Sequence, residues 1–172
     1  GSRAASVERH SSLEEQLSTR SSDPGDMPGA TKQELKMARA FEVRQRDVLK
    51  KAMLAALKAV GGRQEFKESF SEPVWDMFEI DRGAYEQAVA KPMDFKTLRA
   101  LIGKDAYRYD KGGFEAFRSD LLLIGRNCQQ YNSDVEEYVE LGQELVDAAN
   151  EECDKRWQQA QQELQSGVLM SR

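Results

Sequence analysis

The chain has 172 residues, of which 40% are hydrophobic and 32% are charged, a composition that suits one soluble domain with its own core. Its formal net charge of −5 argues against a nucleic-acid-binding protein, which would carry a basic surface for phosphates, and suits a basic partner. No apolar run predicts a membrane span, and no signal-peptide pattern opens the chain.

The residue types that catalytic and metal sites require are scarce. Cys128 and Cys153 form no C-x-x-C pair, so we expect two reduced thiols on helices inside a cell. The one histidine, His10, lies in a polar segment, which argues against a histidine triad, a His-ligated zinc site or a histidine general base. We therefore predict no enzymatic activity, no metal and no cofactor.

Residues 1–30 are rich in Ser, Gly and Asp, contain two prolines and hold few large apolar side chains. Such a segment cannot bury enough apolar surface to offset the cost of ordering, so we predict a flexible tail. Gly1-Ser2 looks like the remnant of a cleaved tag, and we expect the sequence to be part of a larger protein.

The first predicted helix begins at Thr31, because Thr31 and Glu34 have the T-x-x-E spacing of a capping box. Neither Gly nor Pro interrupts the sequence from there to residue 60, and Gly61-Gly62 is typical of a helix C-terminus. The apolar stripe expected to face the core consists of Met37, Phe41, Val48, Ala52, Ala55 and Ala59.

Residues 61–92 keep no sustained helical period and are interrupted by glycines and prolines. A loop this long and this apolar is unlike a solvated linker, so we predict that it folds back over the helices and is functional. The side chains expected to be buried there are Phe66, Phe70, Val74, Trp75, Met77, Phe78, Ile80, Tyr85 and Val89.

Three further helices are predicted after this loop. Asp94 caps a short one that ends near Gly103, and a longer one follows the Gly112-Gly113 pair. Ser133 and Glu136 form a second capping box that begins a last helix reaching about Leu164. The second of these helices carries a continuous apolar stripe of Phe114, Phe117, Leu121, Ile124, Cys128 and Tyr131.

The expected fold is therefore an all-α bundle of four helices with one long loop after the first, and Asn132 lies at the joint between the last two helices. Several motifs in these elements resemble the bromodomain family, over about residues 40 to 160. They are Phe70-Ser71-Glu72-Pro73-Val74, Tyr85, Lys91-Pro92-Met93-Asp94, Phe117-x-x-Asp120 and Asn127-Cys128-Gln129-Gln130-Tyr131-Asn132. The resemblance implies a left-handed bundle over 31–165, with a C-terminal tail over 166–172.

The resemblance also implies a pocket for acetylated lysine between the long loop and the joint. Asn132 matches the asparagine that anchors the acetyl carbonyl, Tyr85 the tyrosine that reaches this carbonyl through a water, and Tyr138 the gatekeeper beside the lysine stem. The apolar walls would be Phe70, Val74, Ile80 and Cys128, with Tyr131 supporting Asn132 from beneath. Alone, each residue has a structural explanation as a cap or a core side chain; together, they favour a binding site.

Two departures from the family pattern bear on binding. Where many members begin the loop with a Trp-Pro-Phe shelf, this chain has Glu68-Ser69-Phe70, so a carboxylate is expected in place of the shelf. The loop between Val74 and Tyr85 is also about one residue longer than usual, which bears on the place of Ile80 in the pocket wall.

We expect a nuclear, monomeric reader of acetylated histone tails that does not bind nucleic acid directly. Between Asn132 and Glu152 there are eight acidic residues and no Lys or Arg, and the first three would lie at the pocket rim, facing a basic peptide. These three are Asp134, Glu136 and Glu137. The alternative is a bromodomain-like helical scaffold with a vestigial pocket, which acts through another surface.

Overall fold

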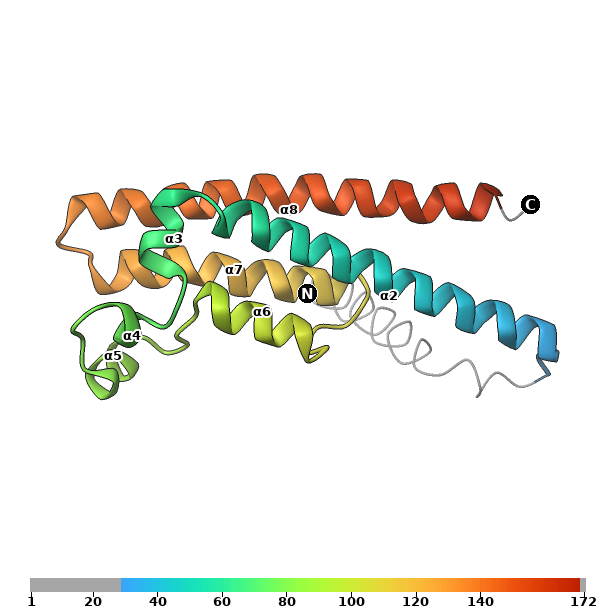
Figure 1. Ribbon diagram of the computed structural model, residues 1–172, viewed down its shortest axis with the longest axis horizontal. Helices are drawn as coiled ribbons and strands as arrows, with labels where there is room; N and C mark the ends of the chain where they lie inside the picture. The colour runs from blue at the N-terminus through green and yellow to red at the C-terminus, as the bar shows by residue number, and fades with distance from the viewer. Residues whose placement is uncertain (1–28, 171–172) are drawn as a thin grey trace, which may run out of the picture. The chain divides into compact units, whose positions relative to one another are not determined.

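The computed structural model describes residues 29–170, with side chains up to residue 167 (Figure 1). Almost all of the predicted flexible tail, including His10, lies outside these residues. The chain divides into two compact units, Gly1–Arg44 and Gln45–Arg172. Helix α2 (Lys32–Gly61) begins in the first unit and ends in the second.

The described part of the first unit is the start of α2. The predicted capping box is confirmed, since the backbone N of Thr31 donates to Glu34 Oε2 and the backbone N of Glu34 donates to Thr31 Oγ1, both at 3.1 Å. Met37 and Phe41 are 61% and 49% exposed, so the prediction that they face a core is wrong. A single helix can shield one flank of such a side chain at most, and no other element of this unit is described.

The second unit is all-α, as predicted, and none of its described residues forms a strand. Helices α6 (Phe95–Gly103), α7 (Lys111–Tyr131) and α8 (Glu136–Met170) lie alongside the C-terminal half of α2 around one core (Figure 1). The largest fully buried side chains come from all four of these helices and from α3. They include Leu49, Met53, Leu57, Phe66, Leu98, Ile102, Phe114, Phe117, Leu121, Ile124 and Leu145.

The buried face of α2 in this unit is displaced from the predicted one. Ala55 and Ala59 are only partly buried, and the core positions belong to larger side chains. Since successive residues on a helix are about 100° apart, a stripe drawn through alanines can miss the buried face by one position. The buried residues are Val48, Leu49, Ala52, Met53, Ala56, Leu57 and Val60.

The segment from residue 62 to 94 is ordered, and it contains three short helices that the sequence pattern did not predict. These are α3 (Gln64–Phe70), α4 (Val74–Met77) and α5 (Arg82–Ala88). Helices of four to seven residues span two turns at most, too few for a period to be visible. The predicted burial is confirmed for Phe66, Phe70, Tyr85 and Val89 and is wrong for Phe78, which is exposed.

Helix α7 begins three residues earlier than the sequence indicates, so the glycine pair lies in its first turn. Asp110 is the N-cap, and its Oδ1 accepts a hydrogen bond from the backbone N of Gly113 at 2.7 Å. A Cβ atom at Gly113 would lie 1.7 Å from the carbonyl oxygen of Arg108. Gly113 therefore allows the backbone of Arg108 to pack closely against the first turn of α7. Gly112 and Gly113 belong to this helix and not to the loop before it.

Helix α8 begins at Glu136, so the predicted capping box of Ser133 and Glu136 is wrong. The chain first makes a turn in which the backbone N of Val135 donates to Asn132 O at 2.9 Å. Val135 O then accepts the first helical hydrogen bonds, from the backbone N atoms of Tyr138 and Val139. The helix also continues past Leu164 to Met170, over residues that contain no proline.

Asp105 ties α2 to the loop between α6 and α7. Its backbone has a φ of 56°, and its carboxylate accepts hydrogen bonds from Arg46 Nη2 at 3.2 Å, from Lys50 Nζ at 3.0 Å and from the Tyr109 hydroxyl. These bonds, that of Tyr109 first, hold the pKa of the carboxyl below its ordinary value of 3.8. Asp105 therefore stabilises the fold above that ordinary pKa, and the contribution is lost as pH falls through the lowered pKa.

We accordingly expect Asp105→Asn to lower the free energy of unfolding at neutral pH and to change it much less at an acidic pH below the lowered pKa, where the carboxyl is protonated. Asparagine tolerates the positive φ, so the backbone is not the cause of the loss. Urea denaturation of both proteins at the two pH values measures the difference. Equal losses at both pH values would show that the charge of Asp105 is not what stabilises the loop.

Candidate functional site

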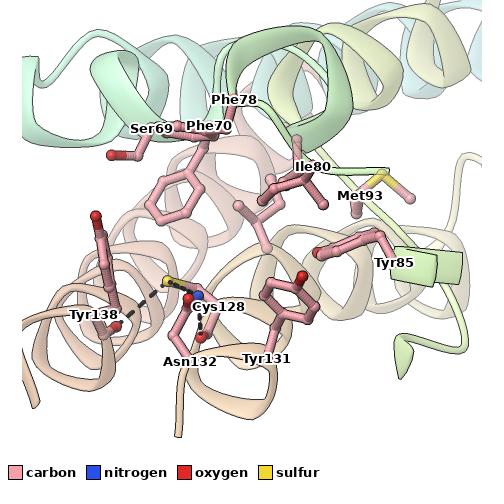
Figure 2. Close-up of a pocket in the computed structure, with 12 residues that line it drawn as sticks. Ser69, Phe70, Phe78, Ile80, Tyr85, Met93, Cys128, Tyr131, Asn132 and Tyr138 are labelled. Carbon is pink, nitrogen blue, oxygen red and sulfur yellow. Dashed lines mark hydrogen bonds between the residues drawn. The ribbon is translucent and has the colours of Figure 1, made fainter. Parts of the chain in front are cut away.

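A cavity of about 140 Å³ opens between the α3–α5 segment and the ends of α7 and α8 that face it (Figure 2). All eight residues that the sequence assigns to the pocket line it. The full lining is Ser69, Phe70, Val74, Phe78, Ile80, Tyr85, Met93, Ile124, Cys128, Tyr131, Asn132 and Tyr138. Ten of these twelve residues are apolar or aromatic, so the cavity suits an apolar ligand group that carries few polar atoms.

The two sides of the cavity come from different kinds of structure. Ile124, Cys128 and Tyr131 are spaced by four and three residues on α7, which places them on one face of the helix. The opposite side comes from the short helices and the turns between them. Figure 2 shows Phe70 entering from that side, with Asn132 and Tyr138 below it.

Asn132 is the C-cap of α7, where the helix ends and the chain turns toward α8. Its Nδ2 donates a hydrogen bond to Cys128 O at 3.0 Å, which fixes the carboxamide against the end of the helix. Nδ2 also lies 3.9 Å from Cys128 Sγ, at the distance of a weak hydrogen bond. A carboxamide nitrogen carries two N–H donors, so one can keep the bond to Cys128 O while the other exchanges this weak contact for a ligand carbonyl.

Cys128 connects the end of α7 to the start of α8. Its thiol donates to Tyr138 O at 3.4 Å, and its own carbonyl accepts from Asn132. Burial raises the pKa of this thiol, so the group is neutral near pH 7 and acts as a small apolar side chain rather than as a nucleophile. Cys128 thereby links the positions of Asn132 and Tyr138.

Tyr85 is only 3% exposed, and its ring centroid lies 4.9 Å from that of Tyr131. Burial raises the pKa of its hydroxyl to about 12, so the group keeps its proton at neutral pH. Figure 2 shows this hydroxyl directed toward the interior of the cavity. It can therefore donate to a water or a carbonyl there without bringing in a charge.

Two amide side chains of α7 hold the chain between α5 and α6 against the helix. Asn127 Nδ2 donates to Lys91 O at 2.8 Å, and Gln130 Nε2 donates to Ala88 O at 3.1 Å. Lys91 Nζ also pairs with Asp120 Oδ1 at 2.7 Å. Within the Asn127–Asn132 motif, Cys128, Tyr131 and Asn132 thus line the cavity. Asn127 and Gln130 instead hold the chain between α5 and α6 in place by hydrogen bonds.

The structure corrects two expectations about the lining. Tyr131 is 37% exposed and packs beside Tyr85, so the prediction that it ends the buried stripe of α7 is wrong. Position 131 follows the helical spacing, but it lies at the open end of the bundle. The carboxylate of Glu68 accepts a hydrogen bond from Gln64 Nε2 at 2.7 Å and does not line the cavity, whereas Ser69 does.

Four lining residues were not assigned to the pocket from the sequence. Ile124 could have been found, since it lies one helical turn before Cys128 on the same stripe. Met93 belongs to the Pro-Met-Asp motif, which was noted without a role for its methionine. Ser69 and Phe78 had no such signal, because their positions depend on how the short helices fold.

Neither a membrane-spanning helix nor a metal site is found among the described residues. No helix in this part of the chain combines the length and apolar character that a membrane crossing requires. Within the same residues, no three His, Cys, Asp or Glu side chains gather in a way that could hold a metal ion.

Comparison with known proteins gives several similar chains. At 29% identity over 93 residues, this chain is similar to the SWR1 complex bromodomain subunit bdf1 of Schizosaccharomyces pombe, with 54% of this chain and 15% of that protein covered. At 35% over 69 residues, it is similar to bromodomain-containing protein bet-1 of Caenorhabditis elegans, with 40% and 8% covered. At 38% over 64 residues, it is similar to human bromodomain and PHD finger-containing protein 3, with 37% and 5% covered.

The aligned residues therefore span at most 15% of the length of these relatives. The family model described as Bromodomain matches residues 54–144, which is more than half of the chain and includes the whole cavity lining. Bromodomains are in general non-catalytic modules that bind acetylated lysine in chromatin proteins. On the motifs, the helical fold and this match, the chain belongs to the bromodomain family.

Proposed function

We propose that this domain binds acetylated lysine on histone tails in the nucleus, as a monomer and without catalysis, and that the cavity around Asn132 is the binding site. The observation that carries the proposal is the carboxamide of Asn132 at the edge of an apolar cavity, held by a hydrogen bond of 3.0 Å to Cys128 O and a longer one of 3.9 Å to Cys128 Sγ.

The chemistry of the cavity suits a neutral acyl-lysine and not a free lysine. Acetylation replaces the ammonium with an amide and a methyl group, and an apolar lining accepts both the methyl and the alkyl stem. Burying an unpaired ammonium there would be costly. The acyl carbonyl still needs a donor, because an unpaired buried acceptor costs about 1–3 kcal/mol, and the second N–H of Asn132 provides one.

The remaining lining residues have distinct parts in this proposal. The Tyr85 hydroxyl holds a water that bridges to the acyl carbonyl. Tyr138, which is 41% exposed, borders the mouth and flanks the lysine stem. Because Ser69 stands where many relatives have an apolar shelf, we expect weak binding, with a Kd on the order of tens of micromolar to millimolar, or about 4–6 kcal/mol.

The rim beside Tyr138 is acidic. Asp134, Glu136 and Glu137 are all exposed and lie in the turn and first helical residues between Asn132 and Tyr138. These carboxylates attract the Lys and Arg residues of a histone-like tail. Exposed charges of this kind raise the association rate and its salt dependence more than they raise affinity.

A heteronuclear NMR titration with matched histone-tail peptides, acetylated and unmodified, tests the proposal. We expect saturable shifts with acetylated peptides alone, centred on the signals of Asn132, Tyr85 and Tyr138. If a broad acetylated panel left these signals unmoved, the cavity would not be an acetyl-lysine site. A helical scaffold that binds partners through another surface would then be the better explanation.

The bridging role of Tyr85 gives a separate prediction. Tyr85→Phe keeps the ring and removes the hydroxyl, so we expect acetyl-peptide affinity to fall about three- to tenfold, the value of one modest hydrogen bond. Isothermal titration calorimetry measures the change. Tyr109→Phe is the control, since it removes a hydroxyl outside the cavity and should lower stability while affinity stays the same.

A further inference from the structure

Trp75, which does not line the cavity, packs against the ring of Tyr85, which does. The ring centroids of Trp75 and Tyr85 are 6.1 Å apart with an interplanar angle of 62°, an edge-to-face arrangement. The guanidinium carbon of Arg82 lies 4.6 Å from the centroid of the Trp75 ring, and Arg82 Nε pairs with Glu86 Oε1 at 2.7 Å. Arg82, Trp75, Tyr85 and Tyr131 thus form a continuous series of packed side chains, each in contact with the next.

The backbone around Tyr85 has little stability of its own. Helix α4 has four residues and α5 has seven, and isolated helices shorter than about 12–15 residues are marginal in water. Gln130 fastens the last carbonyl of α5, one turn beyond Tyr85, which leaves the tyrosine ring itself to be fixed by packing. The rings of Trp75 and Tyr131 both pack edge-to-face against it.

These contacts assign Trp75 a role that the sequence did not indicate, since there it was only one of several apolar residues of the loop. We propose that Trp75 is a positioning residue of the acetyl-lysine site: held by Arg82, its ring keeps Tyr85 against Tyr131 and its hydroxyl inside the cavity. The predicted effect of Trp75 on peptide binding rests on the proposed function. The predicted effect of Trp75 on the position of Tyr85 rests on the geometry alone.

A residue that acts through the Tyr85 hydroxyl has a recognisable signature in a double-mutant cycle. If Trp75 only stabilised the fold, the loss of affinity in the double variant would be the product of the losses in the two single variants, because independent effects add in free energy. If Trp75 positions the hydroxyl, its loss matters little once the hydroxyl is gone. The two effects are then strongly non-additive.

The experiment compares acetyl-peptide affinity by calorimetry in the wild type, Trp75→Ala, Tyr85→Phe and the double variant. We expect about fivefold weaker binding for Trp75→Ala, a similar loss for Tyr85→Phe, and a double variant within about twofold of Tyr85→Phe alone. Trp75→Phe should restore affinity to within about twofold, because it keeps an edge-to-face ring. Wild-type affinity in Trp75→Ala, or losses that multiply in the double variant, would overturn the assignment.

A second measurement needs no peptide and so separates this proposal from the proposed function. Burial raises the pKa of Tyr85 to about 12 from its ordinary 10.0, and the ¹³Cζ chemical shift reports ionisation. At about pH 11, roughly a tenth of Tyr85 is ionised in the wild type, and we expect a clearly larger fraction in Trp75→Ala, because the exposed ring loses part of its burial. If the pH titration of Tyr85 were the same in Trp75→Ala and in the wild type, the positioning role of Trp75 would be overturned, even if all acetylated peptides bound. If the titration changed but no peptide bound, the positioning role would stand and only the proposed function would be overturned.

Two further variants control for folding. Should Trp75→Ala not fold, Trp75→Leu retains apolar bulk without a ring and takes its place in both measurements. Trp157 packs against Phe114 with centroids 5.1 Å apart, away from the cavity lining, so Trp157→Phe removes the chain's other tryptophan. We expect this control to keep both the wild-type affinity and the wild-type titration of Tyr85; a change in either would show that loss of any tryptophan perturbs the site.

Discussion

Asn132→Ala is expected to abolish detectable binding of acetylated peptides while the helical content stays at the wild-type level. The substitution removes the donor for the acyl carbonyl, and an unpaired buried carbonyl costs about 2 kcal/mol, a factor of roughly 30. For a site with a Kd of tens of micromolar to millimolar, such a loss gives a Kd of about a millimolar or weaker, so that the titration no longer saturates. Circular dichroism and the same NMR titration measure the two quantities.

Two matched variants make the result specific. Asn132→Asp has nearly the same shape but presents acceptors only, so it should fail to bind as well. Ser133→Ala changes the exposed neighbour in the same turn and should bind like the wild type. An Asn132→Ala protein that bound acetylated peptide normally would show that the anchor has been placed on the wrong residue.

The second large effect concerns Gly125 of α7 and Gly142 of α8, where the two backbones touch. A Cβ atom at Gly125 would lie 2.4 Å from Gly142 O, and one at Gly142 would lie 2.5 Å from Gly125 O. Since backbone atoms cannot move aside as a flexible side chain can, the helices would have to separate. We expect Gly125→Ala to lower the free energy of unfolding by about 3 kcal/mol, measured by urea denaturation.

Gly103→Ala is the control for this prediction. Gly103 is the last residue of α6, and a Cβ atom there meets nothing within 4 Å. Because alanine is the better helix former by about 1 kcal/mol, this variant should be as stable as the wild type or slightly more stable. Equal stabilities for Gly125→Ala and Gly103→Ala would mean that the two helices tolerate separation at the crossing.

The features that could be predicted from the sequence are those with local signals. The helical periods gave the all-α class, and the Thr31–Glu34 spacing gave the start of α2. The Asn127–Asn132 motif, with the residues matched to it, led to eight side chains that do line one cavity. Their roles in binding remain predictions, because a lining position does not by itself show what a side chain contacts in a complex.

The features that were missed depend on tertiary contacts. The S-x-x-E spacing at Ser133 is a sound local signal, but the turn through Val135 replaces it, because the chain must reverse direction before α8 can pack along α7. The glycines of the helix crossing look like ordinary weak positions in a helix until both helices are placed. For the same reason, the aromatic contact between Trp75 and Tyr85 has no signature in the sequence.

The contact between Gly125 and Gly142 also decides how the cavity can adapt to ligands of different size. Helices whose backbones already touch cannot approach further, and the Gln129 side chain, which donates to Val139 O at 3.1 Å, resists their separation near the cavity. The α7–α8 side of the site therefore has a fixed form. Any change of width must come from the side formed by α3 to α5. Under the proposed function, selectivity among acylated lysines would therefore depend on this segment, while Asn132 at the end of α7 would hold the carbonyl in a fixed place.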